Sequence, residues 1–281
     1  MIGLALLVMA TQQTATLDTT IAVRPETRLE VSAAAGSIDV KTWDRAAVRV
    51  IATPSRGATP QVTLDGAVLR VSAQVPGGRI DLVDYQITVP RRMDLKLGWG
   101  DVDITVHDAE GAVEARNSGG AGTITISGGR GTIDAQSIDG PIVIRHARGR
   151  MIARSTNAAV AIDSSSGDVD AQSTMNHVTL TAIETHNLRA TSVGGVVKFS
   201  GPFFPDGRYD LSSHSGSIWL TVPAPINATV SVATVNGAFT SGVPHDIVER
   251  RRRGIFTARF GDGRAQVSVE SFNGAIVLGP M

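Results

Sequence analysis

Two aspartates, Asp134 and Asp170, are the residues of this 281-residue chain whose type and spacing come closest to catalytic chemistry. They fall in one outward column of a repeating strand pattern, which reads Glu114, Asp134, Ile152, Asp170, Arg189 and Asp210. Stacked at the interstrand spacing, the two aspartates would lie about 9.6 Å apart, at the upper edge of the range for an inverting glycosidase pair. The interleaved arginines are more typical of a solvated face with cross-strand pairing. A polysaccharide lyase or hydrolase is therefore the alternative hypothesis.

A second outward column carries few charges and short, β-prone side chains. Its candidate binding residues are Thr125, Thr179, Lys198 and Trp219. A flat, weakly charged strand face of this kind can bind another molecule, or it can be covered by the protein's own terminal strands. Trp43 and Trp99 are the other two tryptophans that could anchor a contact, although each could equally serve packing.

Composition excludes several classes of site. The chain has no cysteine, so we expect no disulfide, zinc ribbon, iron–sulfur cluster or thiol nucleophile. Basic and acidic residues balance at 26 each, which gives no electrostatic footprint for nucleic acid. The six histidines fall in different columns, and no HExxH, GxSxG or phosphate-binding loop is present. GDVD occurs at 100–103 and 167–170, but the aspartate that a calcium-binding roll needs in every turn is missing. We predict no metal and no cofactor.

A nine-residue period organises these columns. From residue 131 the chain divides into GTIDAQSID, GPIVIRHAR, GRMIARSTN, AAVAIDSSS, GDVDAQSTM and NHVTLTAIE. Each unit alternates apolar and other residues and then turns, which is the signal of a short strand. Two units make one coil, so the pattern predicts an all-β fold, a single-stranded parallel β-solenoid with about 18–22 residues per coil. An antiparallel sandwich is the competing all-β fold.

The inward positions specify the register. One strand column has alanine at its second inward position, and the partner column has large apolar residues there. The alanines are Ala115, Ala135, Ala153, Ala171 and Ala190, and the large residues are Ile126, Ile144, Ile162, Leu180, Phe199 and Leu220. Small side chains in one sheet that face large side chains in the other let the two sheets interdigitate across a thin core. Serines at 137, 155, 173, 192, 213 and 271 share a turn position, where they are expected to cap backbone groups.

The two ends carry their own signals. The apolar run at residues 2–10 is too short to span a bilayer and resembles an export signal, with a buried first strand as the alternative. We divide the chain into an export signal at 1–15, opening strands at 16–92, solenoid repeats at 93–245 and closing strands at 246–281. Residues 26–281 form one continuous domain in this interpretation. Residues 245–253 could form a short helical turn, and the charge run ERRRR at 249–253 is expected in a solvated loop or against an anionic surface.

Several turn–strand segments resemble a bacterial family of β-strand repeat proteins, provisionally labelled adhesins and known as domain of unknown function 4097. The segments are SIDGPIVI (137–144), SHSGSIWL (213–220), TVNGAFTS (234–241) and SFNGAIVL (271–278), together with AAAGSIDVKTWDRAAVRV (33–50), DYQITVPRRMDLKL (84–97) and the closing stretch 252–279. The resemblance covers about residues 26–281 and departs from the family's turn at Ala158 and Asn176. It implies an exported solenoid of the cell envelope and carries no catalytic residue over.

Together these features favour a non-enzymatic, exported β-solenoid that acts as a binding or structural module at the bacterial cell envelope. Its expected partner is an envelope polymer or envelope protein, not nucleic acid. We expect no integral membrane span, and a location in the periplasm or at the cell surface. Self-association through poorly capped terminal coils is a further possibility.

Overall fold

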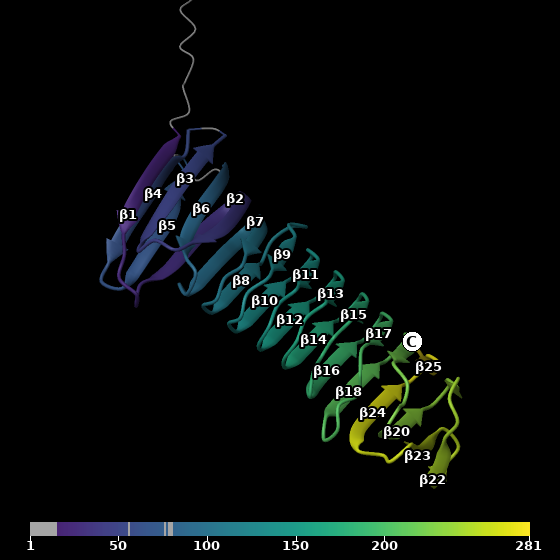
Figure 1. Ribbon diagram of the computed structural model, residues 1–281. Helices are drawn as coiled ribbons and strands as arrows, with labels where there is room; N and C mark the ends of the chain where they lie inside the picture. Colours follow the sequence, from purple (N-terminus) through teal and green to yellow (C-terminus); the bar gives the residue numbers. More distant parts are fainter. Residues whose placement is uncertain (1–15, 56, 76, 78–80) are drawn as a thin grey trace, which may run out of the picture.

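The chain folds into an elongated stack of β-strand coils (Figure 1). The computed structural model describes residues 16–55, 57–75, 77 and 81–281, and the export signal predicted at 1–15 lies outside these residues. The described part has no α-helix and 25 strands joined in one continuous, mostly parallel sheet. No helix that could cross a membrane occurs among these residues. The predicted all-β solenoid is confirmed.

The central coils each contribute one strand to each of two opposed faces. Face A contains β8 (Val113–Asn117), β10 (Ile133–Ser137), β12 (Met151–Ser155), β14 (Val169–Ser173), β16 (Asn187–Ser192) and β18 (Arg208–Ser213). Face B contains β9 (Ile124–Ser127), β11 (Ile142–Arg145), β13 (Val160–Asp163), β15 (Val178–Thr181), β17 (Val197–Ser200) and β19 (Ile218–Val222). Neighbouring strands are parallel and in register, with Met151 pairing with Val169 and Leu188 with Tyr209. These registers give coils of 18 to 21 residues, which fall within the predicted range.

The core between the two faces has the predicted division into small and large side chains. Ala135, Ala153 and Ala171 are neighbours in successive face A strands and are fully buried. Ile144, Ile162 and Leu180 occupy the facing column of face B, each at most 1% exposed. A thin core of this kind reaches native packing density because one sheet supplies the volume that the other lacks.

A ladder of buried serines closes one edge of the stack. Ser173 Oγ accepts a hydrogen bond from the Asn176 amide (3.1 Å) and donates to the Ala158 carbonyl of the preceding coil (2.9 Å). The same pair of bonds recurs at Ser155, Ser192, Ser213 and Ser271. Each hydroxyl therefore satisfies a turn amide and links two coils, which confirms the predicted capping role and explains why these serines are buried.

At the N-terminal end, two long strands bend from face A to face B. They are β2 (Arg28–Trp43) and β7 (Leu95–His107), and they pair in parallel along most of their length. The bends lie at Gly36 (φ 114°) and Gly98 (φ 118°). A Cβ on Gly98 would overlap the Arg116 carbonyl oxygen, so the close approach of two backbones requires glycine there. Both strands thereby supply complete coils without a break between their two halves.

Antiparallel strands complete this end. On face B, β6 (Leu82–Pro90) pairs with β2, then with β3 (Ala47–Pro54), which pairs with β1 (Leu17–Ala22). On face A, β5 (Val68–Gln74) lies beside β2 and pairs with β4 (Thr59–Asp65). The parallel coils therefore end under antiparallel strands, a common way to protect the open edge of a sheet.

At the C-terminal end, the order of coils in space differs from their order in the chain. The last strands, β24 (Ala265–Ser271) and β25 (Ile276–Pro280), pair directly with β18 and β19. The preceding strands, β20 (Ala228–Thr234) and β21 (Phe239–Ser241), lie beyond them. Figure 1 shows yellow β24 between green β18 and green β20. The chain therefore passes over the position of one coil and returns to fill it.

An antiparallel hairpin ends face A. It consists of β22 (Asp246–Arg252) and β23 (Ile255–Phe260), with β23 pairing with β20. The short helical turn predicted at 245–253 is wrong, because this segment is extended and paired in β22. The charge run at 249–253, expected in a solvated loop or against an anionic surface, instead lies on the outermost strand up to residue 252, and Arg251 pairs there with Glu249 at 3.0 Å. Charged side chains on an edge strand oppose pairing with another chain.

Candidate functional site

The predicted acid column exists on face A, but its members are engaged with neighbours. Glu114, Asp134, Ile152, Asp170, Arg189 and Asp210 follow one another in register across six strands. The Asp170 carboxylate accepts from Arg154 Nη2 at 2.6 Å and from Gln172 Nε2 at 2.8 Å. The Asp134 carboxylate accepts from Gln136 Nε2 at 3.0 Å. A hydrogen bond thus holds the Asp134 carboxylate, and a hydrogen bond together with an ion pair holds the Asp170 carboxylate.

The two aspartates also lie in different depressions. Asp134 lines a hollow with Glu114 and Lys96, whereas Asp170 lines another with Arg189 and Arg208. Ile152 lies between them in the column. The two carboxylates of the proposed pair therefore do not line the same hollow. The described residues contain no group of three or more histidines and acids that could hold a metal ion.

The weakly charged column lies on face B as the repeat predicts. Thr125, Val143, Ala161, Thr179, Lys198 and Trp219 pair in register, one residue from each successive coil. Thr179, Lys198 and Trp219 therefore lie in three consecutive strands, and Thr125 lies three coils away from Thr179. Trp219 is 47% exposed and Lys198 is exposed, while the threonines are half-buried by their cross-strand neighbours.

No described strand lies across the outer side of face B (Figure 1). Each face B strand pairs only edge to edge within the sheet. The strip from Thr125 to Trp219 is therefore a continuous flat surface at least six coils long, with its one large aromatic and its one cation at the C-terminal end. We call these six residues the face B strip.

The other two tryptophans lie near the N-terminal end, in different environments. Trp99 follows the bend of β7, has a φ of 143° and is 73% exposed. Trp43 ends β2, is half-buried, and donates from its indole nitrogen to the Ala47 carbonyl at 2.7 Å. The Arg45 guanidinium lies over the Trp43 ring, 5.2 Å from its centre. Neither tryptophan joins the face B strip.

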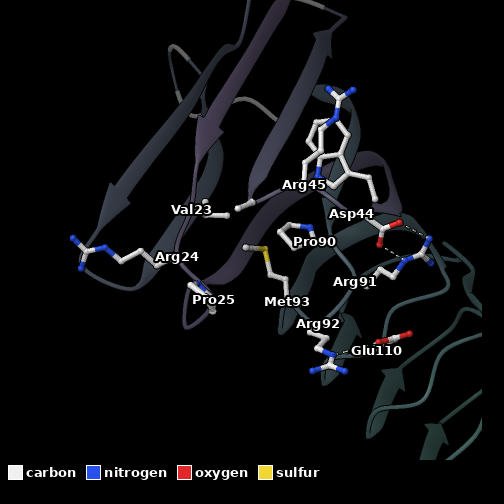
Figure 2. A pocket seen from close by; sticks show the side chains of 12 residues that line it. Val23, Arg24, Pro25, Asp44, Arg45, Pro90, Arg91, Arg92, Met93 and Glu110 are labelled. Carbon is white, nitrogen blue, oxygen red and sulfur yellow. Dashed lines mark hydrogen bonds and ion pairs between the residues drawn. The ribbon is translucent and has the colours of Figure 1, made fainter.

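A pocket that the sequence did not predict lies beside Trp43 (Figure 2). It has a volume of about 480 Å³ and is lined by residues 23–25, 43–46, 90–93 and 110. Trp43 and Pro90 are the last residues of β2 and β6, and the others belong to the four connections that follow β1, β2, β6 and β7. Because turn residues from distant segments build the pocket, no spacing in the sequence marks it. Its only trace is the density of arginines in WDR (43–45) and PRR (90–92).

An ion pair shapes one side of this pocket. Arg91 donates to both carboxylate oxygens of Asp44, at 2.6 and 3.3 Å. The hydrogen bond and the charge of Arg91 lower the pKa of Asp44, and those of Asp44 raise the pKa of Arg91. Both side chains are therefore charged at neutral pH and form an exposed ion pair.

No protein-family model matches the chain. No curated protein is significantly similar to it either. Among solved structures, it is similar to a provisionally assigned cell adhesion protein from Clostridium sporogenes, at 9% identity and a TM-score of 0.25, over 95% of this chain and all of the other. It is also similar to a provisionally assigned adhesin from Bacteroides fragilis, at 12% identity and a TM-score of 0.30, over 96% of this chain and 98% of the other. At these values the likenesses assign no function to the chain.

Proposed function

We propose that this chain is an exported, non-enzymatic binding module of the bacterial cell envelope, adhesin-like in action, located in the periplasm or at the cell surface. The observation that carries the proposal is the face B strip: an open, flat and weakly charged strand surface that ends in exposed Trp219 and Lys198. Its partner would be an envelope polymer or an envelope protein.

Rigidity makes this surface suitable for an extended partner. The strip residues are fixed on strands paired on both sides, and each coil is tied to the next by the serine ladder. Little conformational entropy is lost when such a surface binds. The indole of Trp219 offers an apolar plane on which a sugar ring or an apolar side chain can stack, and Lys198 beside it can pair with an anion.

The inference of export rests on the apolar run near the N-terminus. The apolar residues 2–10 match the apolar region of a secretion signal. The cysteine-free composition gives no disulfide that could support or oppose this location. Cleavage after residue 10 or 15 would leave β1 as the first strand of the mature protein.

Co-sedimentation tests the proposal. Purified residues 16–281 are mixed separately with peptidoglycan, outer-membrane vesicles and total envelope at low and physiological salt. We expect salt-resistant pelleting with total envelope and with the separated fraction that contains the partner, because the strip carries few charges for salt to screen. Pelleting with none of the three fractions would contradict the binding function.

Variants locate the contact surface. Thr125→Arg with Thr179→Arg places two bulky charges on the face B strip. Gln136→Arg with Gln172→Arg is the control. It places two arginines on face A, each at most one coil away from the substituted threonine on face B. We expect the first pair to abolish pelleting and the second to leave it unchanged. Loss of pelleting in both pairs, or in neither, would exclude the face B strip as the binding surface.

One further pair of substitutions distinguishes the binding module from the alternative, a glycan lyase or hydrolase. Asp134→Asn with Asp170→Asn keeps the shape of both side chains and removes their charge. If the chain cleaves anionic glycans and this variant loses cleavage while remaining folded, the enzyme hypothesis replaces the binding module. We expect no cleavage by either protein.

A further inference from the structure

The pocket beside Trp43 has the composition of a small-ligand site. Its floor is apolar and consists of Val23, Pro25, Pro90 and Met93, with the half-buried Trp43 beside them. Met93 is 3% exposed and is therefore fixed by packing. Figure 2 shows Pro25, Met93 and Pro90 lying between Arg24 on one side and Arg45 on the other. A volume of about 480 Å³ falls in the range of pockets that bind small molecules.

The rim of the pocket carries excess positive charge. Four arginines and two acids line it. Arg91 is neutralised by Asp44, and Arg92 lies 3.6 Å from the Glu110 carboxylate. Among the described residues, no carboxylate forms an ion pair with Arg24 or Arg45, and the Arg45 guanidinium lies over the Trp43 ring. Two guanidinium groups on opposite sides of an apolar floor are thus left without a counter-ion from the protein.

We propose that this pocket binds an amphipathic anion, a molecule in which a carboxylate or phosphate group is joined to an aliphatic or aromatic body. The apolar body would cover Met93 and Pro90, and the anionic group would pair with Arg24 or Arg45. Guanidinium groups match both anions because their planar N–H donors bind two oxygens at once. The site is separate from the face B strip, so this proposal goes beyond the proposed function and stands or fails independently of it.

Tryptophan fluorescence provides a direct readout. The chain has three tryptophans, so Trp99→Phe with Trp219→Phe leaves Trp43 as the only one. This protein is titrated at low salt with decanoate, decyl phosphate, decanol and inorganic phosphate, the amphiphiles below their micelle-forming concentrations. Decanol supplies the body without the charge, and phosphate supplies the charge without the body.

We expect decanoate, decyl phosphate or both to change Trp43 emission saturably, at concentrations about 10-fold or more below those required for decanol or phosphate. The comparison of decanoate with decyl phosphate identifies the preferred anion. Equal binding of decanol and both anions would show a merely hydrophobic hollow and overturn the proposal. An unchanged emission with every probe would overturn it as well.

Arginine variants test the charge requirement by calorimetry, since Arg45 itself contacts the fluorescent ring. Arg24→Gln or Arg45→Gln, whichever removes the guanidinium that pairs with the anion, should weaken binding of the preferred anion about 10-fold, the effect expected for loss of a charge-assisted hydrogen bond. Arg148→Gln is the matched control, because Arg148 is an exposed arginine on the same edge of the stack, beyond the pocket. Far-UV circular dichroism confirms folding of each variant. Equal affinity in all three variants and the parent would contradict the proposed site.

Discussion

In the central coils the order of strands in space follows their order in the chain, whereas at the two ends it does not. From β8 to β17 each strand pairs in parallel with the strands one coil before and one coil after it in the chain. At the C-terminal end, β24 and β25 fill the position between β18–β19 and β20–β21. At the N-terminal end, strands β1, β3 and β4 are antiparallel to their partners.

The difference separates two ways of specifying structure. A central coil needs only its neighbours, because each repeat unit contains the inward residues, the turn and the serine that link it to the next coil. The ends depend on contacts between residues far apart in the chain, such as Tyr209 with Val267. The ends must also protect open sheet edges, which the central coils never expose. The central coils are therefore regular because each one repeats the same local contacts, whereas the ends are irregular because they protect the open edges of the sheet.

The largest expected effect comes from removing a coil. Deletion of residues 151–168 joins Arg150 to Val169 and lets β10 pair with β14 in the same register. Deletion of residues 265–281 exposes the edges of β18 and β19 and leaves β20 without its parallel partner. We expect the central deletion to remain monomeric and melt cooperatively, within about 10 °C of the parent. The C-terminal deletion should associate or lose cooperative melting.

Thermal melting followed by circular dichroism, together with light scattering, checks both deletions. Two variants that aggregate equally, or a C-terminal deletion that melts as the parent does, would show that the ends and the middle are specified in the same way.

A cavity at the C-terminal end should have the next largest effect. Leu211 occupies the column that holds alanine in the central coils, since it pairs with Ala190, and it is fully buried. Leu211→Ala removes most of a fully buried side chain, and we expect a loss of about 2–5 kcal/mol in unfolding free energy. Urea denaturation measures this loss. A value below about 1 kcal/mol would mean that the column is not closely packed there.

The reverse substitution probes the middle of the same column. Ala153 is fully buried between Ala135 and Ala171. Ala153→Leu forces a large side chain into the thin core, so we expect a loss of about 1–3 kcal/mol. Thr125→Ser, an outward change in the same stack of coils, is the control and should leave the urea midpoint unchanged. If Ala153→Leu melts as the parent does, the assigned register is wrong.

Two buried tyrosines, Tyr85 at the N-terminal end and Tyr209 in the coils, are expected to contribute differently to stability. Tyr209 donates to the Thr185 carbonyl at 2.7 Å and accepts from the Phe204 amide at 2.8 Å, so Tyr209→Phe should destabilise by about 1–2 kcal/mol. The buried Tyr85 hydroxyl has no hydrogen-bond partner among the described residues, and Tyr85→Phe should cost nothing at neutral pH. The order of the two urea midpoints at pH 7 checks this comparison, and a reversed order would contradict it.

Tyr85 also predicts an alkaline transition. Burial raises the pKa of Tyr85 from 10.0 to about 12. Between these values the unfolded chain has lost a proton that the folded chain retains, so stability falls as pH rises from 10 to 12 and is unaffected by this group below pH 10. Tyr85→Phe should reduce the loss of stability over that interval. An identical alkaline decrease in the parent and the variant would assign it to other groups.

The smallest expected effect concerns an exposed ion pair of the N-terminal end. The Arg91 guanidinium lowers the pKa of Asp44 below its ordinary value of 3.8. A lowered carboxyl pKa stabilises the fold above 3.8, and this contribution is lost as pH falls through the folded-state value. Asp44→Asn should therefore be slightly less stable than the parent at pH 7 and equal to it at strongly acidic pH. A difference in urea midpoint that persists in acid would point to a role other than the ion pair.

The sequence predicts the central coils well because their specification is local. Alternating residues, a turn serine and a constant period place Ala153, Ile162 and Ser173 correctly without any long-range information. It does not predict the order of the last coils, because the inward pairs Val230/Val232 and Val267/Val269 are equivalent as partners for β18. The helical turn predicted at 245–253 fails because pairing with β23 outweighs the local preference of a charged segment.

The candidate sites divide in the same way. The face B strip follows from the repeat, which places Thr179, Lys198 and Trp219 in one column, as the structure has them. The sequence does not predict the pocket beside Trp43, because four irregular connections converge to form it. Repetition in a sequence therefore reveals surfaces that run along the coils, whereas sites at the ends require the three-dimensional arrangement.

One measurement tests the central claim most directly: envelope co-sedimentation of two variants that change opposite faces of the same two coils. Lys198→Ser with Trp219→Ser alters face B, and Arg189→Ser with Asp210→Ser alters face A. If the face B strip is the binding surface, the first variant should lose binding by about 10-fold or more, and the second should bind as the parent does. Equal binding by both variants, or loss only in the face A variant, would contradict the account.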